Sequence, residues 1–348
     1  MKIVVPKENE KNEKRIPLTP LVIKKLEALG AEVVLEGDLS SADLVIRLNK
    51  PSIEEINCLK KGAIHLSLLD PFHSANLIQA FCEKGVSALC LELIPRSTRA
   101  QKMDVLSSQA SLAGYAAVIL AADHLPKIFP MMTTPSGTLP PAKVFVIGAG
   151  VAGLQAIATA RRLGAAVEAF DTRPAAAEQI RSLGARCLKI NLGETSEMNG
   201  GYAGVLTDEQ LRKQREGIKK ACQEADVVIT TAQVFGKKAP LIVTRDILEG
   251  MKPGSLVIDL AVESGGNVEG VELNREVSIG VTRVFGYSNM SGRVASDAST
   301  MLANNIFNFI EEFWDKNSKS FNLNLEDEII KGCLLTHAGK IVHPLFDK

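Results

Sequence analysis

The chain has 348 residues, with 40 Lys and Arg against 40 Asp and Glu, and 46% of its residues are hydrophobic. This length predicts two domains of ordinary size, and the balanced charge gives no reason to expect nucleic acid or an anionic membrane surface as a partner. The six cysteines are scattered without a C-x-x-C pair, which indicates reduced thiols in a cytosolic protein and no bound metal.

The first hundred residues alternate short apolar runs with amphipathic stretches, which predicts a first α/β domain with a mostly parallel sheet. The expected strands cover residues 2–5, 31–35, 44–48, 63–69 and 87–93, and the expected helices cover 20–29, 54–59 and 74–83. The N-terminus turns polar at once and does not resemble a signal peptide. No apolar run looks long enough to span a bilayer, so any membrane association is expected to go through a protein partner.

Residues 95–109 form a polar stretch, PRSTRAQKMDVLSSQ, ahead of an expected apolar helix at 110–125. The stretch gathers many hydrogen-bonding side chains with little apolar content. From composition alone, a solvated surface loop is favoured over a binding site. Residues 130–141, rich in Pro, Thr, Ser and Gly, are expected to form a linker.

The stretch KVFVIGAGVAGLQAIATARRLGAAVEAFD, residues 143–171, combines a buried strand, a G-x-G-x-x-G turn, a helix, a second strand and an acid. Gly148 allows the tight turn, Gly150 lets the backbone approach a pyrophosphate, and Gly153 lets the helix pack closely. The N–H groups at the start of the helix attract phosphates. Asp171 has the spacing of an acid that binds the adenosine ribose, and its charge favours NAD over NADP.

Arg173 follows this acid and would either pair with a 2′-phosphate or be a solvated surface arginine. Further strands are expected at 187–190, 227–231, 256–260 and 281–285, with helices at 209–225 and 298–314 and a terminal hairpin from 320–325 and 334–342. Tyr202, flanked by Gly200, Gly201 and Gly204, is typical of a mobile lid, although an exposed insertion fits the composition equally well. Asp259 would either face the cofactor or cap nearby backbone N–H groups.

The expected fold is α/β, with two Rossmann-like domains, mostly parallel sheets and a cleft between them. The first domain is expected to cover residues 1–125, completed by 315–348, and the NAD-binding Rossmann domain to cover 139–300. Residues 126–138 and 301–314 are the expected connections. The candidate cofactor-binding residues are Gly148, Gly150, Val151, Gly153, Asp171, Thr172, Arg173, Tyr202, Thr231, Ala232, Asp259 and Glu263.

Five motifs resemble the alanine dehydrogenase/transhydrogenase superfamily, and in detail the NAD-binding α subunits of proton-translocating transhydrogenases. They are R-x-P-L-T-P, the loop R-S-T-R-A-Q-K-M-D-V-L-S-S-Q, G-V-A-G-L-Q-A-I-A-T-A, G-G-Y-A and I-D-L-A-V-E-S-G-G-N. The resemblance implies a two-domain subunit that binds NAD(H), forms a homodimer, and exchanges hydride with NADP(H) on a membrane-spanning partner. It also implies a cytoplasmic location, peripheral on the inner face of the cell membrane through the partner subunits.

The resemblance changes the interpretation of the polar loop. In that family an Arg, a Gln, an Asp and a Ser surround the nicotinamide, and these fall on Arg96, Gln101, Asp104 and Ser107. They are the candidate catalytic residues. The closing tyrosine of the lid falls on Tyr202.

One departure separates the chain from the alanine dehydrogenases of this superfamily. Those enzymes use a Lys and a His to bind pyruvate and move protons, and an ungapped comparison places Asn49 and Asp70 there, with Lys50 and His73 close by. Arg15, which holds the substrate carboxylate in dehydrogenases, is present. Two alternatives to the transhydrogenase subunit therefore remain, an amino-acid dehydrogenase and a non-catalytic NAD-sensing subunit.

Overall fold

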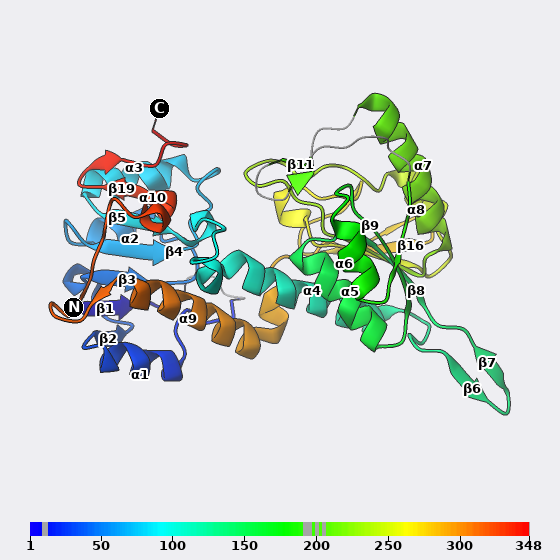
Figure 1. Ribbon diagram of the computed structural model, residues 1–348, viewed down its shortest axis with the longest axis horizontal. Helices are drawn as coiled ribbons and strands as arrows, with labels where there is room; N and C mark the ends of the chain where they lie inside the picture. The colour runs from blue at the N-terminus through cyan, green and yellow to red at the C-terminus, as the bar shows by residue number, and fades with distance from the viewer. Residues whose placement is uncertain (9–12, 191–196, 199–201, 204–206, 348) are drawn as a thin grey trace. The chain divides into compact units, whose positions relative to one another are not determined.

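The computed structural model describes residues 1–8, 13–190, 197–198, 202–203 and 207–347. These residues form two compact units, traced in Figure 1 by the chain colours. Unit 1 consists of Met1–Gln109 and Ala295–Lys348, and unit 2 consists of Ala110–Val294. The sequence of unit 2 is thus inserted into that of unit 1.

Unit 1 contains a seven-stranded sheet of order β2-β1-β3-β4-β5-β19-β20. The first five strands are parallel, whereas β19 runs antiparallel to β5 and β20 antiparallel to β19. The strands are β1 (Lys2–Val5), β2 (Glu32–Leu35), β3 (Leu44–Ile46), β4 (Ile64–Ser67), β5 (Ser87–Cys90), β19 (Leu334–His337) and β20 (Lys340–Ile341). The three central strands β3, β4 and β5 are buried along their whole length, as expected for parallel strands covered on both faces.

The helices of unit 1 begin and end where the local sequence predicts. Pro20 occupies the first turn of α1, Ser52 and Glu55 form a capping box at α2, and Gly85 ends α3 in a left-handed conformation with φ of 71°. These helices are α1 (Pro20–Ala28), α2 (Ile53–Cys58), α3 (Ala75–Lys84), α9 (Ala295–Glu312) and α10 (Glu328–Cys333). Short 3-10 helices cover η1 (Leu39–Ser41), η2 (Leu91–Leu93) and η3 (Gln101–Met103).

The expected pairing of the C-terminal hairpin is wrong. Strand β18 (Ser320–Phe321) pairs with β17 (Trp314–Asp315), and β19 forms its own hairpin with β20 at the edge of the main sheet. The physical reason is that α10 follows β18 and carries Ile329 and Ile330 into the core of unit 1. The segment after it is therefore delivered to the open edge of β5.

Unit 2 contains a second seven-stranded sheet, of order β10-β9-β8-β13-β14-β16-β15, parallel except for β15. Its strands are β8 (Lys143–Ile147), β9 (Ala166–Phe170), β10 (Arg186–Cys187), β13 (Val227–Thr230), β14 (Leu256–Asp259), β15 (Glu276–Ile279) and β16 (Thr282–Phe285). The expected α/β fold with two mostly parallel sheets is thus confirmed. Strand β15 was missed because its residues, E-V-S-I, are mostly exposed and lack an apolar run.

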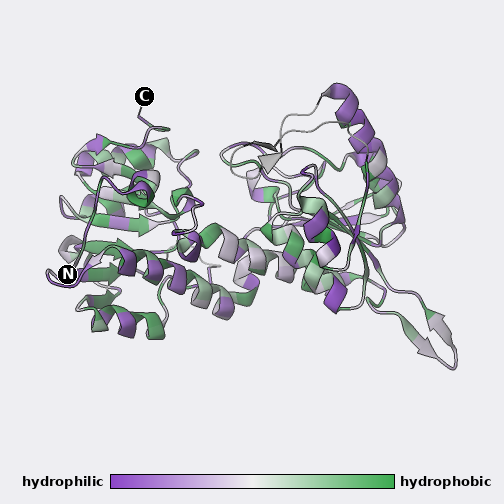
Figure 2. Ribbon diagram, in the orientation of Figure 1, coloured by the Kyte–Doolittle hydropathy of each residue, from purple (hydrophilic) through white to green (hydrophobic). Residues whose placement is uncertain are grey.

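The helices of unit 2 include one of very low apolar content. Figure 2 shows α7 largely in purple, and only Ile218, Ala221 and Cys222 of this helix are buried. The other helices pack through broader apolar faces. The set comprises α4 (Val105–His124, from Ala110 onward), α5 (Val151–Arg162), α6 (Ala176–Ser182), α7 (Asp208–Glu224), α8 (Arg245–Glu249), η4 (Val262–Ser264) and η5 (Met290–Val294).

Two segments differ from the sequence-based expectation. The expected linker at 130–141 contains a β-hairpin, β6 (Met132–Thr134) paired with β7 (Gly137–Leu139), in which every residue is exposed. Helix α4 is long and apolar enough to span a membrane by length and composition, so the expectation that no such stretch exists is wrong. Its residues from Ala116 to Ala121, apart from Ile119, belong to the buried core of unit 2, which is the ordinary reason for an apolar helix in an α/β protein.

The units also differ from the expected domain boundaries in two places. Residues 110–125 fall in unit 2, because Ala117, Val118 and Leu120 pack in its core. Residues 301–314, expected as a connection, fall in unit 1, because Leu302 and Ile306 pack in its core.

Candidate functional site

The glycine turn of unit 2 has the geometry that its sequence predicts. Gly148 adopts φ of 96°, and a Cβ there would lie 2.5 Å from Oγ1 of Thr231. A Cβ on Gly153 would lie 1.9 Å from the carbonyl oxygen of Gly148, so α5 can approach the turn only because residue 153 has no side chain. A Cβ on Gly150, by contrast, would meet no atom within 4 Å.

The open space at Gly150 lies at the N-terminus of α5. Gly150 is the N-cap residue, and Val151, the first residue of the helix, is 43% exposed. The N–H groups of a first helical turn have no partner within the helix and carry a partial positive charge. An open space bordered by such groups fits a pyrophosphate.

Asp171 lies at the end of β9, where it holds the glycine turn. Its Oδ2 accepts a hydrogen bond from the N–H of Ala149 at 2.7 Å. Its Oδ1 accepts from the N–H of Arg173 at 2.8 Å, and the Arg173 guanidinium binds both carboxylate oxygens, through Nε and Nη2, at 3.0 Å each. Arg173 is therefore not the solvated surface arginine that one interpretation expected. Thr172 lies between them in a bend.

The end of β13 approaches the same turn. The hydroxyl of Thr231 donates to the carbonyl of Gly148 at 3.1 Å. Ala232 is held by Asn267, whose Oδ1 accepts from the Ala232 N–H at 3.0 Å and whose Nδ2 donates to the Ala232 carbonyl at 2.8 Å. Asn267 is fully buried, and it also donates to the carbonyl of Pro240. This role was not predicted from the sequence, although a polar residue shortly after a buried strand and two glycines was the available signal.

Asp259, at the end of β14, caps the backbone rather than facing solvent. It is fully buried and accepts from the N–H groups of Ala261, Asn267 and Val268 and from the hydroxyl of Thr230. Burial raises its pKa, and these hydrogen bonds oppose that effect. Of the two roles considered, the structure shows backbone capping, so Asp259 positions the loop instead of presenting a charge to a ligand.

Glu263 lies in η4, and its side chain accepts a hydrogen bond from the N–H of Asn289 at 3.4 Å. It is exposed, unlike Asp259. Of these two acids, only Glu263 therefore has a carboxylate at the surface of unit 2.

In unit 1, the candidate catalytic residues lie between β5 and the first turn of α4. Arg96 and Gln101 are exposed, and Gln101 begins η3. Asp104 precedes α4 and accepts from both the N–H of Ser107 at 2.8 Å and its hydroxyl at 2.6 Å. Asp104 and Ser107 therefore cap the helix together, while Arg96 and Gln101 lie at the surface of the loop.

This loop is fastened to α9 at residue Lys102. The Lys102 carbonyl accepts from the side-chain amides of Asn305 at 2.9 Å and Asn308 at 3.0 Å. The Lys102 ammonium forms an ion pair with Glu312 at 2.9 Å, and this hydrogen bond lowers the pKa of Glu312. The backbone next to Gln101 is thus fixed by three side chains spaced along one face of one helix.

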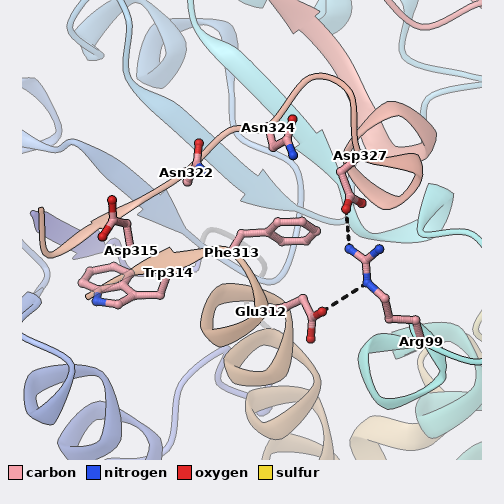
Figure 3. Close-up of a pocket in the computed structure, with 8 residues that line it drawn as sticks. All are labelled: Arg99, Glu312, Phe313, Trp314, Asp315, Asn322, Asn324 and Asp327. Carbon is pink, nitrogen blue, oxygen red and sulfur yellow. Dashed lines mark hydrogen bonds and ion pairs between the residues drawn. The ribbon is translucent and has the colours of Figure 1, made fainter. Parts of the chain in front are cut away.

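Arg99 provides a second attachment of the same loop. Figure 3 shows its guanidinium between Glu312 and Asp327, where it pairs with both carboxylates beside a polar pocket of about 280 Å³. Although burial opposes the effect, the hydrogen bond from Arg99 lowers the pKa of Asp327. The guanidinium also lies 5.7 Å from the ring centroid of Phe313. These contacts hold the loop without using Gln101.

Tyr202 lies in β12 (Tyr202–Ala203), whose backbone pairs with β11 (Glu197–Met198). Gly200, Gly201 and Gly204 lie outside the described residues, so the lid stays a prediction. Among the residues that the structure describes, no group of three or more His, Cys, Asp or Glu side chains is placed to hold a metal ion.

The residues that correspond to the dehydrogenase machinery are engaged with one another in unit 1. Lys50 and His73 both contact Asp70, at 3.4 Å and 2.8 Å, and all three side chains are about half exposed or more. Arg15 is largely buried, and its guanidinium binds both oxygens of Glu13, at 2.9 Å and 2.7 Å. The Glu13 side chain is only 1% exposed.

Family models match both halves of the chain. The alanine dehydrogenase/PNT N-terminal domain matches residues 28–113, and the alanine dehydrogenase/PNT C-terminal domain matches residues 117–344. The chain belongs to the alanine dehydrogenase/PNT family. The sequence-based resemblance is thereby confirmed.

Individual members of the family resemble the chain over its full length. An NAD(P) transhydrogenase subunit alpha chain of Rhodospirillum rubrum is 41% identical, over 99% of this chain and 98% of that protein. The crystal structure of transhydrogenase from Sinorhizobium meliloti superposes with a TM-score of 0.86 at 40% identity, covering 99% of this chain and 100% of that one. A structure of L-alanine dehydrogenase shares the fold, with a TM-score of 0.80 at 22% identity over 99% of this chain and 98% of that one.

Proposed function

We propose that the chain is the NAD(H)-binding subunit of a proton-translocating NAD(P)+ transhydrogenase. The observation that carries the proposal is the full-length similarity to transhydrogenase subunits at about 40% identity, compared with 22% for the alanine dehydrogenase structure. The glycine turn with open space at Gly150 supports the binding of a dinucleotide, and Asp171 supports NAD(H) over NADP(H).

The residues divide the proposed task into anchoring and orientation. The first turn of α5 binds the pyrophosphate, and Asp171 binds the adenosine ribose. The bound cofactor supplies the hydride. Arg96, Asp104 and Ser107 orient the nicotinamide, Gln101 contacts the nucleotide of the partner subunit, and Tyr202 closes over the site.

Direct hydride exchange between two nicotinamides requires orientation and exclusion of water, but no proton donor. A dehydrogenase, in contrast, needs a general acid or base beside the reacting carbon and a cation for the substrate carboxylate. In this chain the carboxylate of Glu13 already occupies both sides of the Arg15 guanidinium in a largely buried ion pair. This arrangement supports the transhydrogenase over an amino-acid dehydrogenase, because a substrate carboxylate would be repelled by Glu13.

The proposal includes partners and a location. The NADP(H)-binding domain and the membrane-spanning subunits are separate chains, on which this subunit docks at the cytoplasmic face of the membrane. A homodimer is part of the same proposal. The hairpin β6–β7 supports it, since this uncharged segment exposes Met132 and Leu139 and leaves both strand edges unpaired.

The test is reconstitution with transhydrogenase membrane subunits that hold NADP+. We expect hydride transfer from NADH to NADP+ that is stimulated by a proton gradient, and no NADH formation from L-alanine and NAD+ at any pH. NADH production from alanine by the purified chain would contradict the proposal in favour of the dehydrogenase. The homodimer is tested by light scattering of the full chain and of a variant with a shortened β6–β7 hairpin.

A further inference from the structure

The carboxylate of Asp171 has no acceptor position left for a ribose. A carboxylate offers about four lone-pair positions. Here Oδ1 accepts from the N–H and the Nε of Arg173, and Oδ2 accepts from Ala149 N–H and from Nη2 of Arg173. The Asp171 side chain is only 8% exposed. The hydroxyls of a ribose donate hydrogen bonds to such an acid, so some of these donors must leave when the ribose binds.

The guanidinium of Arg173 is the group that can leave. The two backbone N–H donors are fixed by the glycine turn and by the chain after β9, whereas the guanidinium is carried on a flexible side chain that is 22% exposed. Its third contact, from Nη2 to the carbonyl of Ala149 at 3.1 Å, is also with the turn. Arg173 therefore occupies the ribose-binding carboxylate and the edge of the pyrophosphate turn at once.

We propose that Arg173 determines nucleotide specificity by competing with the adenosine ribose for Asp171. The inference rests on the proposed binding of NAD(H) and names the residue that sets its strength and selectivity. Binding of NAD(H) exchanges the guanidinium for the ribose hydroxyls. A 2′-phosphate is excluded only while the Asp171 charge is present, because the guanidinium beside it has the fork geometry that binds phosphate.

The two residues then have opposite effects that can be separated. Removal of Arg173 frees the carboxylate for the ribose and leaves its charge uncompensated toward a 2′-phosphate. Removal of the Asp171 charge releases the guanidinium to bind that phosphate. The second effect requires Arg173, so the double variant decides between this mechanism and a simple loss of repulsion.

The experiment is calorimetric titration of the full chain with 5′-AMP and with adenosine 2′,5′-bisphosphate, which differ only in the 2′-phosphate. For Arg173→Ala we expect 5′-AMP to bind at least about threefold more tightly and the bisphosphate to bind more weakly. For Asp171→Asn we expect the bisphosphate to gain about tenfold or more. In the double variant we expect that gain to disappear.

Arg186→Ala is the matched control, because Arg186 also pairs with an acid of the same sheet, Glu168, and its loss changes the net charge equally. It should leave both affinities within twofold of the wild type. Arg173→Gln, which retains donors without the charge, must shift both affinities in the same directions as Arg173→Ala. Melting temperatures show that each variant is folded.

A gain for the bisphosphate that persists in the double variant would overturn the inference, as would weaker binding of 5′-AMP by Arg173→Ala. Failure of the proposed function gives a different result, since the wild-type chain would then bind neither nucleotide. The ligands lack nicotinamide, so the outcome does not depend on the residues proposed for hydride transfer.

Discussion

Two neighbouring glycines of the fingerprint should give opposite phenotypes when each is replaced by alanine. In Gly153→Ala, the new Cβ would lie 1.9 Å from the Gly148 carbonyl oxygen, whereas real contacts of this kind are essentially never shorter than 3.0 Å. Both partners are backbone-bound, so α5 must shift by roughly 1 Å and disturb the packing of Ala156 and Ile157, which are fully buried.

The magnitude follows from two opposing effects. Overpacking against a rigid neighbour costs about 3 kcal/mol, and replacing Gly by Ala within a helix returns about 1 kcal/mol. We therefore expect Gly153→Ala to lose about 2 kcal/mol in free energy of unfolding, which lowers the melting temperature of a unit of this size by about 4–8 °C.

Gly150→Ala should change binding instead of stability. Its Cβ would meet no protein atom, and its φ of −76° and ψ of −168° are accessible to alanine. The melting temperature should change little, since the loss of a glycine N-cap costs no more than about 1 kcal/mol. NADH affinity should fall at least about tenfold, equivalent to about 1.4 kcal/mol, because the methyl group enters the space proposed for the pyrophosphate.

The assays are thermal unfolding followed by circular dichroism and titration with NADH monitored by fluorescence. A Gly153→Ala chain with unchanged stability would contradict the contact geometry. A Gly150→Ala chain that binds NADH normally would instead show that the pyrophosphate lies elsewhere.

Three further predictions concern unit 1. Gln101→Asn should slow hydride transfer in the reconstituted complex by about tenfold or more, equivalent to about 1.4 kcal/mol in the barrier, with NADH affinity nearly unchanged in titrations of the chain alone. Replacing Asn305 and Asn308 together by Ala should also slow transfer in stopped-flow measurements, because the Lys102 carbonyl loses both donors; a normal rate would show that α9 does not position the loop. Burial lowers the pKa of His65 from 6.5 to about 3, so its unfolded state takes up the proton first as the pH falls, and stability is lost below pH 6.5. From pH 7 to pH 5 this costs about 2 kcal/mol in urea denaturation, a fall that should be smaller by this amount in His65→Gln and unchanged in His73→Gln.

The sequence predicted most of the fold because its signals are local. Parallel strands buried on both faces appear as apolar runs, and Pro20, Ser52 and Gly85 mark helix ends by their own backbone chemistry. The hairpin at β6–β7 was not predicted, because its residues are exposed and do not alternate in polarity. The pairing of β19 with β5 depends on contacts between residues about 250 positions apart, which no local pattern reports.

The candidate site was predictable where backbone geometry demands particular residues, as at Gly148 and Gly153. It was not predictable where a side chain chooses between partners. Asp171 and Arg173 are two residues apart, yet only the fold shows that the guanidinium binds the carboxylate and not solvent. For the same reason the buried role of Asn267 could not be inferred from its position after β14.

The insertion of one unit within the other has a consequence for synthesis. The edge of β5 is covered only by β19, and the core of unit 1 includes Leu302, Phe309, Ile329 and Ile330. All of these leave the ribosome after the whole of unit 2. Domains generally fold as units once their sequence has emerged. The nascent chain therefore holds residues 1–109 as an incomplete sheet with an unprotected edge while the nucleotide-binding unit matures, and this interval is when the chain is most exposed to aggregation and most in need of a chaperone.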